Sequence, residues 1–354
     1  MADTSYAVND SLAVQLWAKK LEAEVLKQTY IGKFIGESAD SLIHKKKELG
    51  TNAGDKVTFG LRMQLAGDGV EGDGILEGNE ESLTTYSDAV YINQLRHAVR
   101  SGGKMSEQRV PFSVRNEAMS GLKDWMAGRV DTAFFNQICG VTDQTDTRYT
   151  GHNATIAPSS TRLLIAETGS TTESQIDSGD TFNLTWVDEV VTRVKLSTPL
   201  IRPIMVDGEE KYVMFLHPYQ VRDMRTSTTT GQWLDIQKAA LSANGSKKNP
   251  IYTGALGEYN GVVFHESTRI PVGTNSGTPI TTVRRAVLCG AQAAAIGFGK
   301  GTEGVSSANW TEKSFDYGNK LGVAGGLIWG LKKTVYNSVD FGTFVVSSYA
   351  AASA

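Results

Sequence analysis

The residues whose types and spacing could do chemistry are gathered in the glycine-rich, acidic segment 67–81, which reads GDGVEGDGILEGNEE. Its first three glycines follow the G-x-G-x-x-G spacing of a dinucleotide-binding loop, which needs a helix directly after it and backbone amides that face phosphate. No helical pattern follows here, and Asp68, Glu71 and Asp73 would repel phosphate. The same acids miss the residue order of a calcium-binding EF-hand loop. We interpret the segment as a hairpin tip kept soluble by its charge.

Other catalytic arrangements find little support in the sequence. There is no Gly-x-Ser-x-Gly elbow, and the five histidines lack a paired metal-ligand spacing such as His-Glu-x-x-His. His217 and His265 each close a strand-like run, where we expect a turn-capping or structural role. The acid pairs Asp188–Glu189 and Glu209–Glu210 leave a hydrolytic enzyme as the weakest alternative, because neighbouring carboxylates do not converge on one substrate. We therefore predict no catalytic residue, no metal ligand and no cofactor.

Composition narrows the class of protein further. The 354 residues are 40% apolar and carry a formal net charge of −3, which excludes intrinsic disorder and argues against a general nucleic-acid-binding protein. No run approaches the ~20 apolar residues of a membrane-spanning helix. The start, MADTSYAVND, lacks the pattern of a secretory signal. The 2 cysteines cannot build a disulfide scaffold, so we expect a reducing cytoplasm.

Two strand-like runs flank the acidic segment. Residues 55–66 alternate between apolar and polar side chains, the period-two pattern of a half-buried strand, with apolar positions at Val57, Phe59, Leu61 and Met63. A second run covers 83–99. Together they predict a two-stranded ribbon that projects about 40 Å at a rise near 3.3 Å per residue. Because an isolated ribbon is marginally stable in water, its apolar face needs another surface to lie on.

The strongest helical pattern follows the ribbon. Ser113 is a suitable N-cap and Gly140 a suitable C-terminal stop, so the helix is expected to be about 40 Å long at 1.5 Å per residue. Apolar residues recur inside it at spacings of three and four, which predicts one buried stripe. We expect that stripe to include Leu122, Met126, Val130 and Phe134.

The rest of the chain mixes both kinds of element and gives the fold class α+β. A helical pattern with one apolar stripe begins near Ser11 and leads to a basic run at 44–47, while 141–180 is polar with little periodicity. Helices are expected at 185–196, 221–224, 231–242 and, from small residues, 291–296. Strands are expected at 212–216, after the Asn260–Gly261 turn, at 286–289, and from Trp310 to the apolar 341–346.

This order of elements resembles the major capsid proteins of tailed bacteriophages with the Hong Kong 97 type fold, and most closely the capsid-protein family of N-four-like podophages. The resemblance depends on the order and spacing of short motifs from about residue 50 to 345. These are GGKMS at 102–106, LKDW at 122–125, DTAFFNQ at 131–137, YNGV at 259–262, DYG at 316–318 and GGLIWGLKK at 325–333.

The resemblance implies five regions of the chain. Residues 1–52 would form an N-terminal arm and 53–104 an extended β-hairpin that lies over an adjacent subunit. Residues 105–180 would hold the spine helix and peripheral domain, and 181–310 an axial domain. Residues 311–354 would return to the peripheral sheet and form the C-terminus. Some relatives join subunits through a lysine–asparagine bond, but no such pair is identified in this sequence.

The resemblance also implies the function. The chain would be a structural protein that self-assembles into the icosahedral shell enclosing phage double-stranded DNA, so it would be made in the bacterial host cytoplasm and reside in the virion. Its partners would be copies of itself in pentamers and hexamers, a portal, scaffolding or decoration proteins, and weakly contacted DNA, with no membrane. A tail-tube or adhesin subunit is the main alternative. We expect inter-subunit contacts at Phe59, Leu61, Met63, Asp68, Glu71, Asp73, Glu77 and Tyr91.

Overall fold

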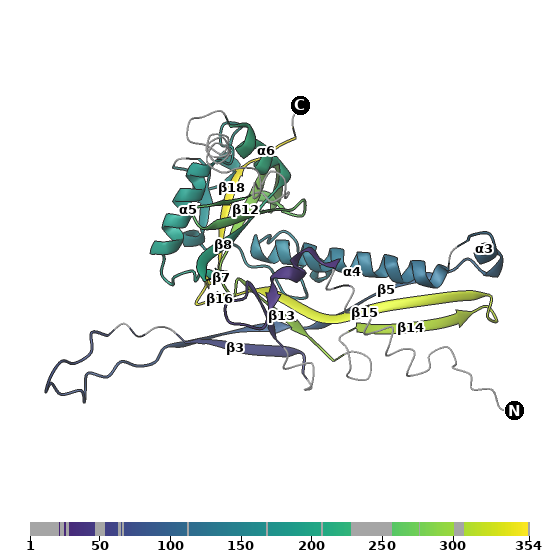
Figure 1. Cartoon of the computed structure of the whole chain (residues 1–354), viewed down its shortest axis with the longest axis horizontal. Helices are drawn as coiled ribbons and strands as arrows, with labels where there is room; N and C mark the ends of the chain where they lie inside the picture. The colour runs from purple at the N-terminus through teal and green to yellow at the C-terminus, as the bar shows by residue number, and fades with distance from the viewer. Residues whose placement is uncertain are drawn as a thin grey trace.

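The computed structural model describes residues 21, 25, 28–46, 54–62, 65, 67–111, 113–167, 169–206, 208–227, 257–275, 277–300 and 308–352, with the backbone alone at Leu61 and Arg62. Met63, the expected helix 231–242, Lys47 of the basic run and most of the expected N-terminal helix lie outside these residues. Figure 1 shows two sheet-containing units, a long helix beside one of them, and a ribbon that projects beyond both.

The first unit is a six-stranded sheet with the long helix packed on it. Its strand order is β1 (Ile35–Gly36), β2 (Ile43–Lys46), β13 (Ala294–Phe298), β15 (Lys320–Lys333) and β14 (Ala308–Phe315). The sixth strand, β5 (Asn93–Arg100), also pairs with β15. Residues 35–46, which the resemblance assigns to the arm, therefore belong to this sheet.

The long helix is α4 (Val114–Ile138), which confirms the predicted helix. Ser113 occupies the N-cap position, and Gly140 has a φ of +64° just after the helix. A Cβ on Gly140 would lie 2.6 Å from the carbonyl oxygen of Ile156, so only glycine fits there. The structure buries Leu122, Met126, Val130 and Phe134 in one core cluster with Leu327 and Trp329 of β15, each at most 2% exposed.

The second unit is an eight-stranded sheet. Its main order is β6 (Leu163–Ile165), β18 (Thr343–Tyr349), β12 (Thr278–Cys289), β8 (Glu209–Leu216), β10 (Val262–Glu266) and β9 (Glu258–Tyr259). Two further strands pair at its side, β11 (Val272–Asn275) with β12 and β7 (Ile204–Val206) with β8. The helices α5 (Leu184–Leu196) and α6 (Pro218–Thr226) pack with it. The helix and hairpin turn expected at 185–196 and Asn260–Gly261 are confirmed.

Alternation along the strands joins the two units. In β8, Tyr212, Met214 and Leu216 pack in the cluster formed with α5 and α6. Val213 and Phe215 point to the opposite face and join the cluster around α4. Because the eight-stranded sheet is buried on both faces, its central strands are continuous apolar runs instead of alternating ones.

One predicted helix is wrong. Residues 291–293 form a turn and bend, and residues 294–296 begin β13, a strand in the middle of the six-stranded sheet between β2 and β15. The sequence AQAAAI favours a helix locally because alanine is the best helix former. Pairing with a neighbour on each side and complete burial of the strand, from Ala294 to Phe298, override that preference.

The ribbon differs from the prediction at its second strand. Strand β3 (Lys56–Arg62) pairs antiparallel with β4 (Thr85–Tyr91), and the chain then leaves the ribbon at Ile92 to continue as β5 in the six-stranded sheet. The run 83–99 is therefore two strands with different partners. No glycine or proline marks this change at Ile92, and a hydrophobic pattern does not report which strand a backbone pairs with.

The C-terminal part of the chain adds strands to both units. β14 and β15 join the six-stranded sheet, whereas the last strand β18 pairs with β12 and β6 of the eight-stranded sheet. The shorter elements are α3 (Lys104–Gln108), β16 (Val335–Tyr336), β17 (Val339–Asp340), and single turns at Tyr30–Phe34, Thr147–Tyr149, Ser160–Arg162 and Glu173–Gln175. Of the helices described, none is long and apolar enough to cross a membrane.

Candidate inter-subunit surfaces

The ribbon is held firmly to the body along β4. The Asp88 carboxylate forms an ion pair with Lys332 and accepts the backbone N–H of Val335 at 3.1 Å. Next to it, Val57 and Val90 are buried, and the rings of Phe59 and Tyr336 meet edge to face with centroids 6.3 Å apart. The root of the ribbon is thus part of the folded body.

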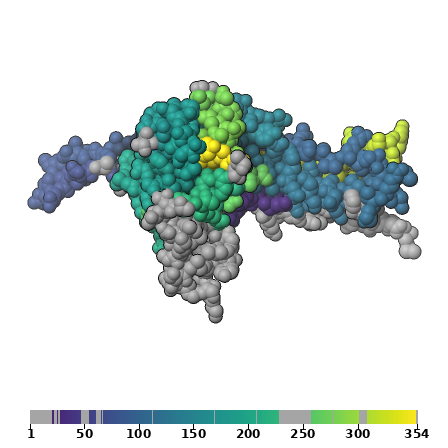
Figure 2. All heavy atoms as spheres, turned by 90° about the horizontal axis from the view of Figure 1, so that it is seen from above, coloured from purple at the N-terminus to yellow at the C-terminus, as the bar shows by residue number. Residues whose placement is uncertain are grey.

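The tip of the ribbon has the opposite character. All residues from 67 to 85 are exposed, and Figure 2 shows the tip extending away from the body. Its turns are closed by local bonds: Glu81 Oε2 accepts the N–H of Gly67, and Glu80 Oε2 accepts the N–H of Gly78, each at 2.7 Å. Large apolar side chains are exposed there as well, namely Leu65 at 59%, Ile75 at 74%, Leu76 at 61% and Leu83 at 57%.

The residues expected at inter-subunit contacts divide between these two regions. The four acids Asp68, Glu71, Asp73 and Glu77 are exposed on the tip. Phe59 lies at the root, half-buried, with the Lys46 ammonium 4.9 Å from its ring centroid. Tyr91 ends β4 with 49% exposure, and Lys56 lies 5.4 Å from its ring centroid. Leu61 pairs with Tyr86 across the ribbon, and Met63 lies outside the described residues.

A second projecting surface lies at the opposite end of the molecule, where β14 turns into β15 (Figure 1). Asp316, Tyr317 and Gly318 all have positive φ, and Tyr317 is fully exposed. Asn319 braces this turn by accepting the N–H of Lys104 at 3.2 Å and by donating to Asp316 Oδ2 at 3.1 Å. Positive φ at consecutive residues is the geometry that a tight β-hairpin turn requires.

The same end carries positive charge. Its described side chains include exposed Met105 of α3 and five cations on α3, directly after α3, and on β5, β14 and β15, namely Lys104, Arg109, Arg100, Lys313 and Lys320. Arg100 and Lys313 lie 4.5 and 5.2 Å from the ring centroid of Phe315. We call this group with Tyr317 the distal cationic end. Its charge and its exposed aromatic ring complement the acidic, partly apolar ribbon tip.

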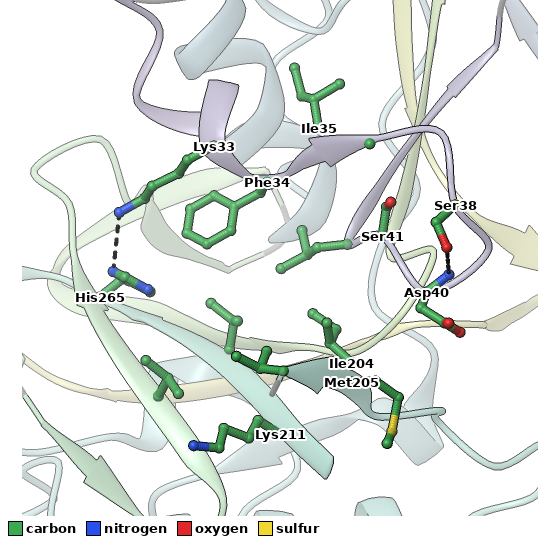
Figure 3. Close-up of a pocket in the computed structure, with 15 residues that line it drawn as sticks. Lys33, Phe34, Ile35, Ser38, Asp40, Ser41, Ile204, Met205, Lys211 and His265 are labelled. Carbon is green, nitrogen blue, oxygen red and sulfur yellow. Dashed lines mark hydrogen bonds between the residues drawn. The ribbon is translucent and has the colours of Figure 1, made fainter. Parts of the chain in front are cut away.

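A cavity of about 550 Å³ lies between the N-terminal segment and strands β7, β8 and β10. Figure 3 shows Phe34, Ile35, Ile204 and Met205 around it, with Lys33 and His265 at one side. Lys33 Nζ lies 3.5 Å from His265 Nδ1. Burial and the Lys33 charge lower the pKa of His265 to about 4, so the imidazole is neutral at pH 7. The cavity therefore offers mainly apolar surface.

The remaining candidates for chemistry have structural roles. His217 caps α6, its Nδ1 accepting the N–H of Tyr219 at 3.2 Å. Asp188 accepts bonds from the Tyr259 hydroxyl and the Asn260 amide, and Glu189 pairs with Arg193 at 2.7 Å. Within the described parts of the chain, no group of three or more His, Cys, Asp or Glu could hold a metal ion.

Sequence reasoning missed two buried charged pairs. Arg285 and Glu173 meet at 2.7 Å, and Lys333 and Asp340 also at 2.7 Å, with all four side chains at most 7% exposed. Burial raises the pKa of Glu173, but the hydrogen bonds and charge of Arg285 outweigh it and hold that pKa below its ordinary value. Glu173 and Arg285 lie more than a hundred residues apart, whereas Lys333 and Asp340 are close in sequence. Neither pair belongs to a periodic pattern, so the sequence does not indicate that the charges meet.

Comparisons with known proteins agree with one another. Residues 5–352 match the family described as phage capsid protein. The chain is 29% identical over 372 residues to the major capsid protein of Pseudomonas phage KPP25, covering 95% of this chain and 94% of that one. It is similar to the capsid of Ralstonia phage GP4, with 32% identity, 99% of both chains covered and a TM-score of 0.78. The capsid of cyanophage Pam1 shares the fold at 20% identity, 93% and 94% coverage and a TM-score of 0.75.

Proposed function

This chain belongs to the phage capsid protein family, and from that premise we propose that it is the major capsid protein whose copies build the shell of a phage head. The observation that carries this conclusion is the similarity over 99% of its length to a phage capsid at 32% identity. The α+β class and the Hong Kong 97 type fold are confirmed by the same likeness. The N-four-like subfamily stays a prediction.

The ribbon is the element proposed to reach a neighbouring copy. Its root is fixed by Asp88 while its tip exposes Ile75 and Leu76, so the apolar surface of the tip lacks cover within the described fold. The distal cationic end of a second copy offers opposite charge together with Tyr317 and Met105. Exposed ion pairs contribute only ~0.2–1 kcal/mol each, so they select the register of the contact and the apolar side chains supply most of its strength.

A contact between opposite ends of two copies is heterologous, since each copy donates one surface and receives on another. Such contacts close into rings when the rotation between copies allows it. Pentamers and hexamers are the rings that this proposal requires. The five regions assigned by the resemblance, with arm, hairpin, spine helix, peripheral domain and axial domain, remain part of the proposal.

Contact with packaged DNA is proposed to be weak and independent of sequence. The net charge of −3 gives no strong basic field. Two lysines of the basic run 44–47 already face aromatic rings, since Lys45 lies 5.1 Å from the ring centroid of Phe298 and Lys46 lies 4.9 Å from that of Phe59. Titration of subunits with duplex DNA at ~0.15 M salt, where the Debye length is about 8 Å, tests this. Submicromolar affinity or a sequence preference would contradict it.

The remaining proposals follow from the role of a shell protein. The chain functions without catalysis, is made in the host cytoplasm and resides in the virion, where a portal and scaffolding or decoration proteins would be further partners. The relatives named above are capsid proteins, so the tail-tube, adhesin and hydrolase alternatives are not carried forward. Electron microscopy of the purified protein tests the function: closed shells are expected, whereas stacked rings, tubes or dispersed monomers would contradict it.

A further inference from the structure

Where the ribbon joins the body, the chain changes the strand with which it pairs over a very short stretch. Up to Tyr91 the second strand pairs with β3, and from Asn93 it pairs with β15. Ile92, the residue between them, donates its N–H to the carbonyl of Asp55 at 2.9 Å. The direction in which the ribbon leaves the body is therefore set at Tyr91 and Ile92.

The side chain of Asn153 holds this point. Its Oδ1 accepts the N–H of Tyr91 at 2.9 Å, and its Nδ2 donates to the carbonyl of Tyr91 at 2.9 Å. The amide thus pairs with both backbone groups on the edge of β4 that faces away from β3, as a neighbouring strand would. Nδ2 also lies 2.9 Å from the carbonyl of Gly151 and 3.2 Å from that of Leu331 in β15.

Asparagine is the residue type that this arrangement requires. One donor faces Oδ1 and three carbonyl oxygens surround Nδ2, so the amide is oriented by its surroundings. Aspartate has the same shape but would place an anionic oxygen against three carbonyls. Because Asn153 is only 4% exposed, water could not easily replace the lost bonds.

The Asn153 side-chain amide, which we call the clamp, is held by buried parts of the fold. Gln137 of α4, fully buried, donates to the carbonyl of Asn153 at 2.9 Å and to that of Thr150 at 2.7 Å. The backbone of Tyr91 crosses directly over Gly330, where a Cβ would lie 1.9 Å from the Tyr91 oxygen. The spine helix, the loop around Asn153 and strand β15 therefore converge on the root of the ribbon.

We propose that Asn153 is a positioning residue that fixes the direction of the ribbon and so places its tip for contact with a second copy. The second half of this statement rests on the proposed function. A strand of seven residues is about 23 Å long at ~3.3 Å per residue, so a turn of about 10° at the root moves its far end by about 4 Å. Such a displacement is enough to miss a side-chain contact.

The test compares three variants of the full-length chain. Asn153→Asp reverses the polarity of the clamp, and Asn153→Ala removes it and serves if the aspartate variant does not fold. Asn136→Asp is the matched control, because Asn136 is also buried and its Nδ2 donates to the carbonyl of Tyr149 in the same loop, not to the ribbon. Spin labels at Thr85→Cys, at the far end of β4, and Lys195→Cys on α5 report ribbon direction, since native Cys139 and Cys289 are buried.

The expected result has two parts. In unassembled subunits, the distance distribution between labels stays narrow in the parent and Asn136→Asp but broadens in both Asn153 variants. The backbone amides of Tyr91 and Ile92 exchange with deuterium about tenfold faster in the Asn153 variants alone. Both changes should appear although the Asn153 variants unfold at the same thermal midpoint as the Asn136→Asp control. A residue that only stabilised the fold would not produce this combination.

Two outcomes separate failure of this inference from failure of the proposed function. A distribution as narrow in both Asn153 variants as in the parent would overturn the positioning role. A broadened distribution together with a parental yield of closed shells would keep the positioning role and overturn the ribbon as an inter-subunit element. A broadened distribution with few closed shells supports both.

Discussion

The root and the tip of the ribbon differ in how their polar and apolar groups are satisfied. At the root, Asp88 and Tyr91 bond to groups of the body, and Val57 and Val90 are buried beside them. At the tip, turns close on themselves and Ile75 and Leu76 remain exposed. The root therefore contributes to the folding of one subunit, whereas the exposed tip is the part that we propose contacts a second copy.

The largest effect is expected from removing the tip. Deletion of residues 67–80 takes away exposed chain only, so subunits should stay soluble with an unchanged unfolding transition. Assembly should fall to few or no closed shells if the tip supplies one half of the inter-subunit contact, as we propose. Electron microscopy and thermal unfolding of the same preparation measure both properties. Normal shells from the deleted chain would show that the tip is dispensable.

A core substitution should instead lower the stability of the subunit itself. Phe134 is fully buried, with ring centroids 5.3 Å from Phe135 and 5.8 Å from Phe215 of the eight-stranded sheet. Phe134→Ala should lower the free energy of unfolding by about 3–5 kcal/mol through lost packing and a cavity. Denaturant unfolding measures this, with exposed Tyr317→Ala as the control. A change below ~0.5 kcal/mol would mean that the side chain is not in the core.

Acid should weaken the folded body of the subunit. Burial, with the charge of Arg284, lowers the pKa of His217 to about 4. Burial and the charge of Lys33 lower the pKa of His265 to about 4 as well. A histidine with a folded-state pKa below its unfolded value contributes stability that is present above pH ~6.5 and is lost as pH falls toward 4. Stability should therefore decline between these values. His217→Asn keeps an N-cap acceptor and should flatten the decline; an unchanged pH profile would contradict the assignment.

The smallest effect is expected from neutralising the tip. Asp68→Asn, Glu71→Gln and Asp73→Asn together should slow assembly and reduce its dependence on ionic strength, since each exposed pair is worth ~0.2–1 kcal/mol. The same changes at Asp177, Asp180 and Glu189, exposed or half-exposed acids of the eight-stranded unit, form the control. Light scattering during assembly at two salt concentrations measures both sets. Equal salt dependence in parent and tip variant would exclude a role for these acids.

Local patterns predicted most elements but not their partners. The spacing of apolar residues gave the correct position of α4 and α5, and Asn260–Gly261 marked its turn. The strand at Ala294–Phe298 was missed because alanine favours a helix until two neighbouring strands pair with it. The division of the second ribbon strand at Ile92 was missed because side-chain alternation carries no information on which backbone the strand pairs with.

The candidate site was predicted only in part for the same reason. The acidic tip is visible in sequence because its charge and glycines are consecutive. The clamp at Asn153 is not, since its partners Tyr91 and Leu331 are 62 and 178 residues away. A polar residue in a segment without periodicity gives no sign that it substitutes for a strand. Such contacts need the folded chain to be recognised.

Hydrogen exchange of the tip in free subunits and in assembled shells tests the central claim most directly. In free subunits the amides of residues 67–84 should exchange at the rate of exposed chain, since the tip is bonded mainly to itself. In shells the same amides should be protected, while those of buried α4 stay slow in both states. Exchange of the tip at equal rates in the two states would contradict the account.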